Sequence, residues 1–193
     1  MKNLSPRSDA LSAAGRAAQD VGAAALLGGN LFGRAAMHPA LAGVSDKSER
    51  GKVVNAAWRR YGVINGLGLA AIVAGWGGAR TYETRNRFLS ERERSLAQAR
   101  DVAVGAVTVT GIATALAGMR FNAMAPEGAV PLRDGGHPAP ETPAKAARVK
   151  RAVNAIGAIN LASEIALVGI NSALSQENFR RPPARRLLKR RWG

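Results

Sequence analysis

Residues 61–79, YGVINGLGLAAIVAGWGGA, form an apolar run of nineteen residues without a charged side chain. A second run, VAVGAVTVTGIATALAGM at residues 102–119, is also free of charge. A helix of this length is about 28 Å long, close to the hydrocarbon thickness of a bilayer. Helices of soluble proteins normally keep a polar stripe for water, and these two runs have none. Both runs therefore predict transmembrane helices.

Two further apolar segments complete the pattern. Residues 21–44 contain one arginine, and residues 152–176 contain one glutamate. Four such segments with charged connections predict an all-α integral membrane protein, a four-helix bundle whose helices extend beyond the bilayer. Residues 1–179 then form one transmembrane domain. The alternative is a soluble bundle, because helices rich in Ala and Gly also form buried hairpins in soluble proteins.

The composition excludes several classes of site. The chain has 193 residues and no cysteine, which excludes disulfides, thiolate metal sites and a cysteine nucleophile. Two histidines are too few for most histidine-based metal sites, so we expect no metal and no cofactor. The abundance of Arg, Ala and Gly indicates GC-rich coding, and we expect the inner membrane of a bacterial cell to hold the protein.

The distribution of basic residues predicts the topology. Lys and Arg number sixteen in the segments before residue 21, at 80–100 and after 179, and eleven in the segments at 47–60 and 120–151. Because cytoplasmic segments carry the excess of basic residues, we expect a multi-pass protein with both termini in the cytoplasm. The first twenty residues are polar and lack the apolar core of a cleavable signal peptide.

The basic C-terminal tail, residues 180–193 (RRPPARRLLKRRWG), holds seven basic side chains and no acid. On the cytoplasmic face such a tail attracts anionic lipid headgroups, by about 1 kcal/mol per basic residue near the surface. The net charge of +15 also raises the alternative of a soluble basic protein that binds nucleic acid. No motif for groove or base recognition accompanies the tail, so we expect no nucleic-acid partner.

Local signals predict where the later helices begin. Ser90 and Glu93 form a capping box, which predicts a helix start at Ser90. Thr142 followed by Pro143 predicts an N-cap and a first helical residue. Between these helices, residues 122–141 are rich in Pro and Gly and predict an irregular outer loop.

A ladder of small residues marks the second apolar segment. Its members recur at every fourth position, which predicts one helix face that a neighbouring backbone can approach closely. They are Gly62, Gly66, Ala70, Ala74 and Gly78. Gly29 and Gly33 offer a matching pair in the first segment. An oligomer is compatible with such a surface, and the oligomeric state stays open.

Polar residues inside the apolar segments predict a polar seam between the first and fourth helices. Its members are Asn30, Arg34, His38, Asn65, Asn160, Glu164 and Asn171, with Thr110 and Thr114 alongside. Counting residues inward from the outer ends places Arg34 and Glu164 about 6 Å apart along the helix axes. A charge at this depth is unfavourable unless it is paired, so we predict an Arg34–Glu164 pair facing the interior, around a pocket open to the outer side.

This seam has two interpretations. In the first, the polar side chains only hold the helices together. In the second, they line a small cavity that binds a lipophilic molecule or relays protons, and Pro39 opens the helix end beside it. The leading hypothesis is therefore a polytopic membrane protein with a binding or structural role and no demonstrable catalysis.

One stretch resembles a known family. GNLFGRAAMHPALAGV at residues 29–44, followed by AAWRRYGVINGLGL at residues 56–69, is similar to the front half of the anthrone-oxygenase-like membrane family. The resemblance implies a small four-helix membrane fold. It also implies the alternative function of a cofactor-free oxygenase acting on a lipophilic, polycyclic aromatic substrate. His38 and Arg34 transfer as candidate catalytic residues, and Glu164 joins them as the acid of the seam.

Overall fold

Four long helices make up most of the chain in the computed structural model, which describes residues 6–82, 89–125 and 130–180. In chain order they are α1 (Pro6–Phe32), α3 (Lys47–Tyr82), α4 (Glu91–Asn122) and α5 (Ala144–Arg180). After α1 the first helix continues through a π-helical turn and two short elements: η1 (Gly33–Met37), α2 (His38–Ala40) and η2 (Leu41–Gly43). Within the described ranges every regular element is helical, apart from an isolated bridge between Leu132 and Pro138. The predicted all-α class is confirmed.

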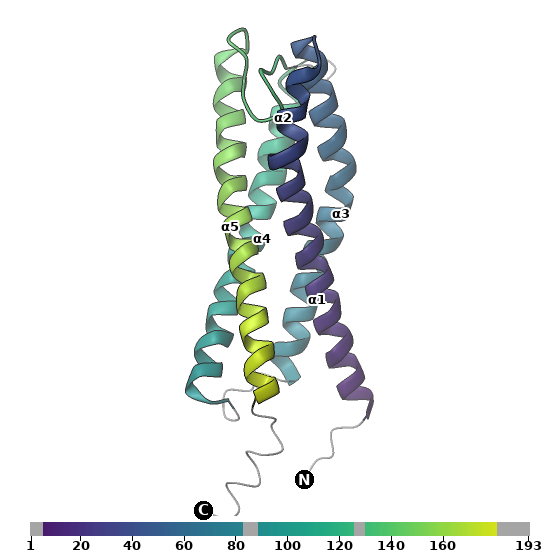
Figure 1. The fold of residues 1–193 in the computed structure, drawn as a ribbon, viewed down its shortest axis with the longest axis vertical. Coiled ribbons are helices and arrows are strands. Elements are labelled where there is room, and N and C mark those ends of the chain that lie inside the picture. The colour runs from purple at the N-terminus through teal and green to yellow at the C-terminus, as the bar shows by residue number, and fades with distance from the viewer. Residues whose placement is uncertain (1–5, 83–88, 126–129, 181–193) are drawn as a thin grey trace, which may run out of the picture.

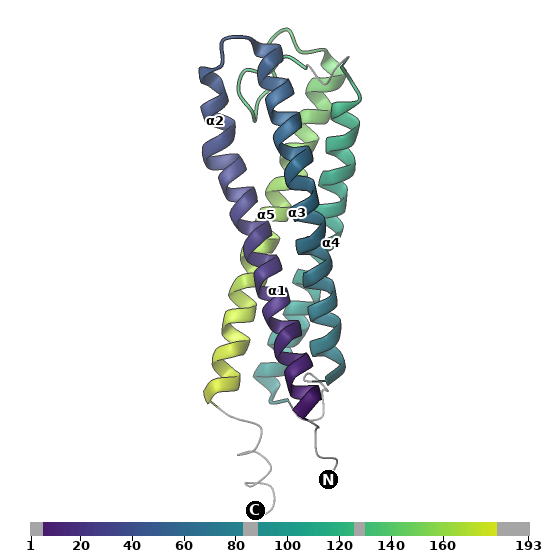
Figure 2. The same cartoon turned by 90° about the vertical axis from the view of Figure 1, so that its right-hand side faces the viewer.

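The four long helices lie lengthwise side by side (Figures 1 and 2). α1 packs mainly against α3, and α4 mainly against α5, while α1–α5 and α3–α4 contacts join the two pairs. α1 begins and α5 ends at the same end of the molecule, here named the terminal end (Figure 1). The opposite end, named the loop end, carries the connection after α2 and the loop at residues 130–143.

Side-chain caps explain where the helices begin. Ser90 Oγ accepts a hydrogen bond from the Glu93 backbone N–H, and Glu93 Oε2 accepts from the Ser90 N–H, so the predicted capping box is confirmed. Asp46 caps α3 with its side chain, because its Oδ1 accepts from the Ser48 and Glu49 backbone N–H groups. The start predicted for the last helix is wrong by one residue, because the Thr142 hydroxyl donates to the Pro131 carbonyl instead of capping, and α5 begins at Ala144.

Glycines on a seven-residue spacing bring α1 and α3 together. A Cβ on Gly15 would lie 3.8 Å from the Gly75 Cα, and a Cβ on Gly22 would lie 2.5 Å from the Gly68 carbonyl oxygen. One heptad further along, Gly29 makes room for the ring of Tyr61. A seven-residue step drifts only about 20° around a helix, so these positions stay on one face of each helix.

The predicted ladder of small residues does not pack against another described helix of the same chain, so its packing against a second copy stays a prediction. Ala70 and Ala74 are exposed, and a Cβ on Gly62, Gly66 or Gly78 would meet no atom within 4 Å. A four-residue step drifts about 40° around a helix, so the ladder winds away from the α1 contact. The matching pair, Gly29 and Gly33, lies close to α3, but against the aromatic rings of Tyr61 and Trp58.

Apolar side chains lie on both the inside and the outside of the structure. Inside, one cluster surrounds Ile72 and Leu167, and another surrounds Phe121 and Leu132 at the loop end. Outside, large apolar side chains project from all four long helices: Val21, Leu31, Phe32, Val63, Ile64, Leu67, Val102, Val109, Ile112, Leu116, Ile159 and Ile165. Of the described helices, α3, α4 and α5 are long and apolar enough to cross a membrane, with mean hydropathy of 1.4, 1.8 and 1.6.

Candidate functional site

Glu164 is the centre of a buried polar network. Its Oε1 accepts hydrogen bonds from Asn30 Nδ2 at 2.7 Å and from Asn160 Nδ2 at 2.6 Å. Asn160 Oδ1 in turn accepts from the Thr110 hydroxyl at 2.8 Å. These four residues, which we name the interior cluster, connect α1, α4 and α5. The structure thus brings together two predicted seam residues from α5, one from α1 and one from α4.

The second carboxyl oxygen of Glu164 has no partner. Glu164 is only 1% exposed, and its Oε2 is buried without a hydrogen bond. Buried polar atoms are nearly always hydrogen-bonded, because an unpaired one loses its contacts with water and gains nothing in return. Glu164 therefore presents an unsatisfied oxygen in the interior of the helices.

Arg34 does not form the predicted ion pair with Glu164. Its Nη2 donates instead to the backbone carbonyl of Asn154, at 3.0 Å. That nitrogen lies where a side chain on Gly157 would stand, so the glycine makes room for the guanidinium. Asn154 is about three helical turns from Glu164 toward the loop end. The long stem of Arg34 therefore carries its charge away from the carboxylate and toward the more open end.

His38 is also separate from the interior cluster. Its Nε2 accepts a hydrogen bond from the indole N–H of Trp58, at 3.0 Å. An indole nitrogen only donates, so Nε2 presents a lone pair and the proton of the neutral imidazole lies on Nδ1. Nδ1 faces Gly136, because a Cβ on Gly136 would lie 3.5 Å from it.

Three other residues predicted in or alongside the seam lie outside the cluster. Asn171 Nδ2 donates to Asp20 Oδ1 at 3.3 Å in an exposed contact. The side-chain oxygen of Asn65 is buried without a partner. Thr114 donates back to the Thr110 carbonyl of its own helix. The predicted seam is therefore not continuous in the structure.

A pocket of about 290 Å³ lies at the loop end. Its lining residues come from the first helix, the loop at 130–143 and α5: Arg34, His38, Pro39, Asp134, Gly136, His137 and Asn154. Arg34 and His38 thus share this pocket, while Glu164 is not among its lining residues. In the described part of the chain, no group of three or more His, Cys, Asp or Glu side chains is placed to hold a metal ion.

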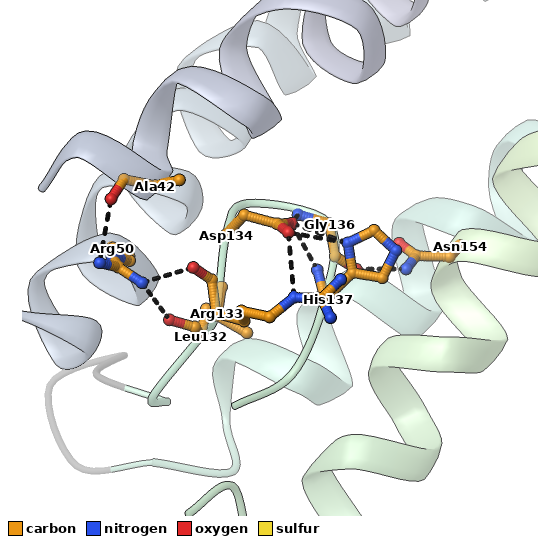
Figure 3. Close-up of polar contacts among 8 residues, drawn as sticks. All are labelled: Ala42, Arg50, Leu132, Arg133, Asp134, Gly136, His137 and Asn154. Atoms are coloured by element: carbon orange, nitrogen blue, oxygen red, sulfur yellow. Dashed lines mark hydrogen bonds and ion pairs between the residues drawn. The ribbon is translucent and has the colours of Figure 1, made fainter. Parts of the chain in front are cut away.

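Hydrogen bonds fix the loop that forms one wall of the pocket (Figure 3). Arg50 of α3 donates to the backbone carbonyls of Ala42, Leu132 and Arg133, which joins the two connections at this end. The Gly135 N–H donates to the His38 carbonyl at 2.9 Å. From α5, the Asn154 side chain donates to the Gly136 carbonyl. The pocket wall is therefore anchored to three helices.

Asp134 organises the tip of this loop (Figure 3). Its Oδ1 accepts from the backbone N–H groups of Gly136 and His137, at 2.7 and 2.9 Å, and the His137 ring lies 2.9 Å from the same carboxylate. Burial alone would raise the pKa of Asp134, but the hydrogen bonds from His137 and Gly136 lower it below the usual range. Asp134 is therefore a carboxylate whose acceptor positions are largely used within its own turn.

Sequence reasoning missed the half of the pocket that α5 and the loop supply. Asp134 followed by two glycines is a turn signal that predicts this hydrogen-bonding pattern. Asn154 carries no such signal, because it lies within the fourth apolar segment six residues before Asn160, a step of about 240° that puts it on another face of the helix. Comparison of the chain with models of protein families, with curated proteins and with solved structures gives no match.

Proposed function

We propose that the chain is a four-span integral membrane protein that binds a small molecule through an anionic group, in the pocket at the loop end. The observation that carries this proposal is the position of Arg34. Arg34 lines the pocket, and its guanidinium has a backbone carbonyl, but no carboxylate, as its hydrogen-bond partner. A carboxylate, sulfate or phosphate group is the natural partner of such a guanidinium.

The outward apolar side chains support membrane insertion. In a membrane, these side chains contact lipid while the polar residues face inward. α1 follows this rule although it is not one of the three helices that are long and apolar enough to cross a membrane on their own: Val21 and Phe32 are 69% and 64% exposed, and Gln19 is 2% exposed. We therefore include the first helix as a span, which makes a four-helix bundle.

The orientation follows from the basic residues. We propose the inner membrane of a bacterial cell, with both termini in the cytoplasm and the pocket on the outer side. The lipid bilayer is then the main partner. In the basic tail, residues 181–193 lie outside the described residues, and their contact with anionic headgroups stays a proposal. Recovery of the full chain in the soluble fraction without detergent would overturn insertion and favour the nucleic-acid alternative.

The electrostatics of the pocket favour an anion. Lys150 and Arg34 both lie close enough to His38 for their positive charges to act on its ring. The carboxylate of Asp134 is occupied by its own turn. The His38 Nδ1–H adds a neutral donor to the pocket wall. A volume of about 290 Å³ is at the low end for ligand sites, so we expect a small molecule or a headgroup.

The test measures anion binding to the full chain purified in an uncharged detergent. Calorimetric titrations use sulfate and the short-chain lipid dihexanoylphosphatidylglycerol, with dihexanoylphosphatidylcholine as the uncharged control. We expect one of the two anions to bind, and Arg34→Gln to weaken binding by about tenfold or more, the value of a charge-assisted hydrogen bond. Binding of sulfate identifies a free anion as the ligand class, and binding of the glycerol lipid alone identifies a headgroup.

Two further variants complete this experiment. Arg59→Gln removes an exposed arginine of α3 and is expected to bind like the wild type. Arg34→Lys keeps the positive charge. Binding by this variant shows that the loss of affinity in Arg34→Gln comes from the missing charge and not from misfolding. The proposal is overturned when neither anion binds the wild type, or when Arg59→Gln weakens binding as much as Arg34→Gln.

The oxygenase alternative has one observation in its favour, which is that His38 and Arg34 line the same pocket. A cofactor-free oxygenase would add dioxygen to a lipophilic aromatic substrate after a base removes its proton, and a neutral His38 is able to act as that base once its bond to Trp58 opens. The test is oxygen uptake by the purified protein with anthrone as substrate, compared with His38→Gln. Oxygen uptake no faster than that of buffer without protein would exclude the oxygenase alternative for anthrone.

A further inference from the structure

The unpaired oxygen of Glu164 marks a place for a proton. One carboxyl oxygen accepts two amide hydrogens, from Asn30 and Asn160, while the other is buried without a donor. Two amide donors hold the carboxyl group in place in either protonation state, because Oε1 still accepts when a proton lies on Oε2, although less strongly than in the carboxylate. A proton on Oε2 removes a buried charge without breaking a contact that the structure contains.

Arg34 contacts the pocket and acts on the Glu164 carboxyl group through its charge. Asn30, which donates to Glu164, and Arg34 are one helical turn apart on the first helix. The opposite charges of Arg34 and Glu164 attract each other although no hydrogen bond joins them. Arg34 also lines the pocket. One cation therefore acts on two anion positions, directly on the ligand outside and at longer range on the carboxylate inside.

We propose that anion binding in the pocket is coupled to proton uptake by Glu164. An anion bound to Arg34 cancels a positive charge that, together with the two asparagine donors, stabilises the carboxylate, so Glu164 takes a proton from solution and becomes a neutral acid. By linkage, protonated Glu164 leaves Arg34 free for the anion, and affinity is higher at low pH. This coupling rests on the proposed binding of an anion by the pocket.

Other titratable groups face the same region, and the experiment separates them from Glu164. From the first helix and the loop, His38, Asp134 and His137 line the pocket, and α5 contributes Lys150 close to His38. From α3, the Tyr61 hydroxyl donates to the Ala25 carbonyl. From α4 the interior cluster receives Thr110, which does not titrate. Only Glu164 of these groups is removed by the test variant.

The test measures the dissociation constants of sulfate and dihexanoylphosphatidylglycerol from about pH 5 to about pH 8, a range in which neither probe titrates. For the wild type we expect the dissociation constant to rise as the pH rises. Because one proton is taken up, this rise reaches at most about tenfold per pH unit, within part of the range. Titrations in two buffers with different ionisation enthalpies report the proton uptake directly.

Glu164→Gln imitates the neutral acid, because its amide oxygen still accepts from the two asparagines. We expect it to bind at all pH values with about the affinity of the wild type at low pH, and without proton uptake. Glu164→Asp restores a titrating group and is expected to restore pH dependence. Glu141→Gln removes an exposed acid of the outer loop and is expected to keep the wild-type slope.

The outcomes separate the two proposals. Binding with the same pH slope in the wild type and in Glu164→Gln overturns the coupling, leaves anion binding intact, and assigns the pH effect to the histidines or Lys150. Binding without any pH slope in the wild type also overturns the coupling. Absence of binding in every chain, at every pH, overturns the proposed function itself.

Discussion

Gly157→Ala tests the position of Arg34 with a single methyl group. A Cβ at residue 157 overlaps Arg34 Nη2, so the guanidinium has to leave the Asn154 carbonyl that it contacts at 3.0 Å. Loss of a hydrogen bond from a charged group destabilises by about 1.5–3 kcal/mol. The gain in helix propensity from Gly to Ala offsets up to about 1 kcal/mol of this. We expect a net loss of about 0.5–2 kcal/mol in the free energy of unfolding.

Gly169→Ala is the matched control on the same helix. A Cβ at residue 169 meets no atom within 4 Å, so this variant is expected to be as stable as the wild type or slightly more stable. The assay is thermal unfolding of both variants in one detergent at one scan rate, followed by sulfate titration. Gly157→Ala should melt several degrees lower than Gly169→Ala and bind more weakly. Equal melting temperatures and equal affinities would refute the contact between Arg34 and the Asn154 carbonyl beside Gly157.

Two more predictions concern helix packing and the loop. Gly22→Ala places a Cβ 2.5 Å from the Gly68 carbonyl oxygen and is expected to destabilise by about 1–3 kcal/mol, whereas Gly66→Ala enters open space and is expected to be neutral or slightly stabilising in thermal unfolding. Because the pKa of Asp134 is lowered in the folded chain, its stabilising contribution is complete at neutral pH, begins to fall near about pH 4 and is lost below the lowered value. Hydrogen exchange at the Gly136 and His137 amides should therefore lose protection in acid.

Each of these predictions has a clear contrary result. A melting temperature for Gly66→Ala below that of Gly22→Ala would favour the ladder as the packing face over the heptad of glycines. Protection of the loop amides that stays constant through the acid range, after correction for the intrinsic exchange rate, would contradict the role given to Asp134. Asp134→Asn, which keeps an acceptor oxygen but does not titrate, should remove the pH effect.

Much of the fold follows from short-range sequence signals. The charge-free runs predict the second and third long helices, because their length and their lack of charged residues are those of a membrane-spanning helix. Ser90 and Glu93 predict a helix start because both partners of the capping box lie within one turn. The choice of packing face was not predictable from spacing alone. Four-residue and seven-residue repeats of glycine occur on the same helix, and only the partner helix decides which of them is used.

The candidate site, like the fold, is predictable from the sequence only where the contacts are short-range. Asn160 and Glu164 are one turn apart, so their contact is predictable from spacing. The direction of Arg34 is not, because depth along a helix does not fix where a long side chain ends. Its actual partner is a backbone carbonyl of Asn154, and any residue carries such a group. The contribution of Asp134 to the pocket depends on the path of the loop, which the sequence does not specify beyond the turn itself.

The pocket combines chain segments that are synthesised far apart in time. Arg34 and His38 emerge from the ribosome early, whereas Asp134 and Asn154 complete the walls only after the third long helix has been made. Until α5 packs, Arg34 lacks the carbonyl that holds it, and the Gly136 carbonyl lacks the Asn154 amide. A nascent or truncated chain that ends before Asn154 therefore has no complete pocket. Under the proposed function, ligand binding requires the chain through at least Asn154, so a ligand would find no complete pocket while the first three long helices are being made.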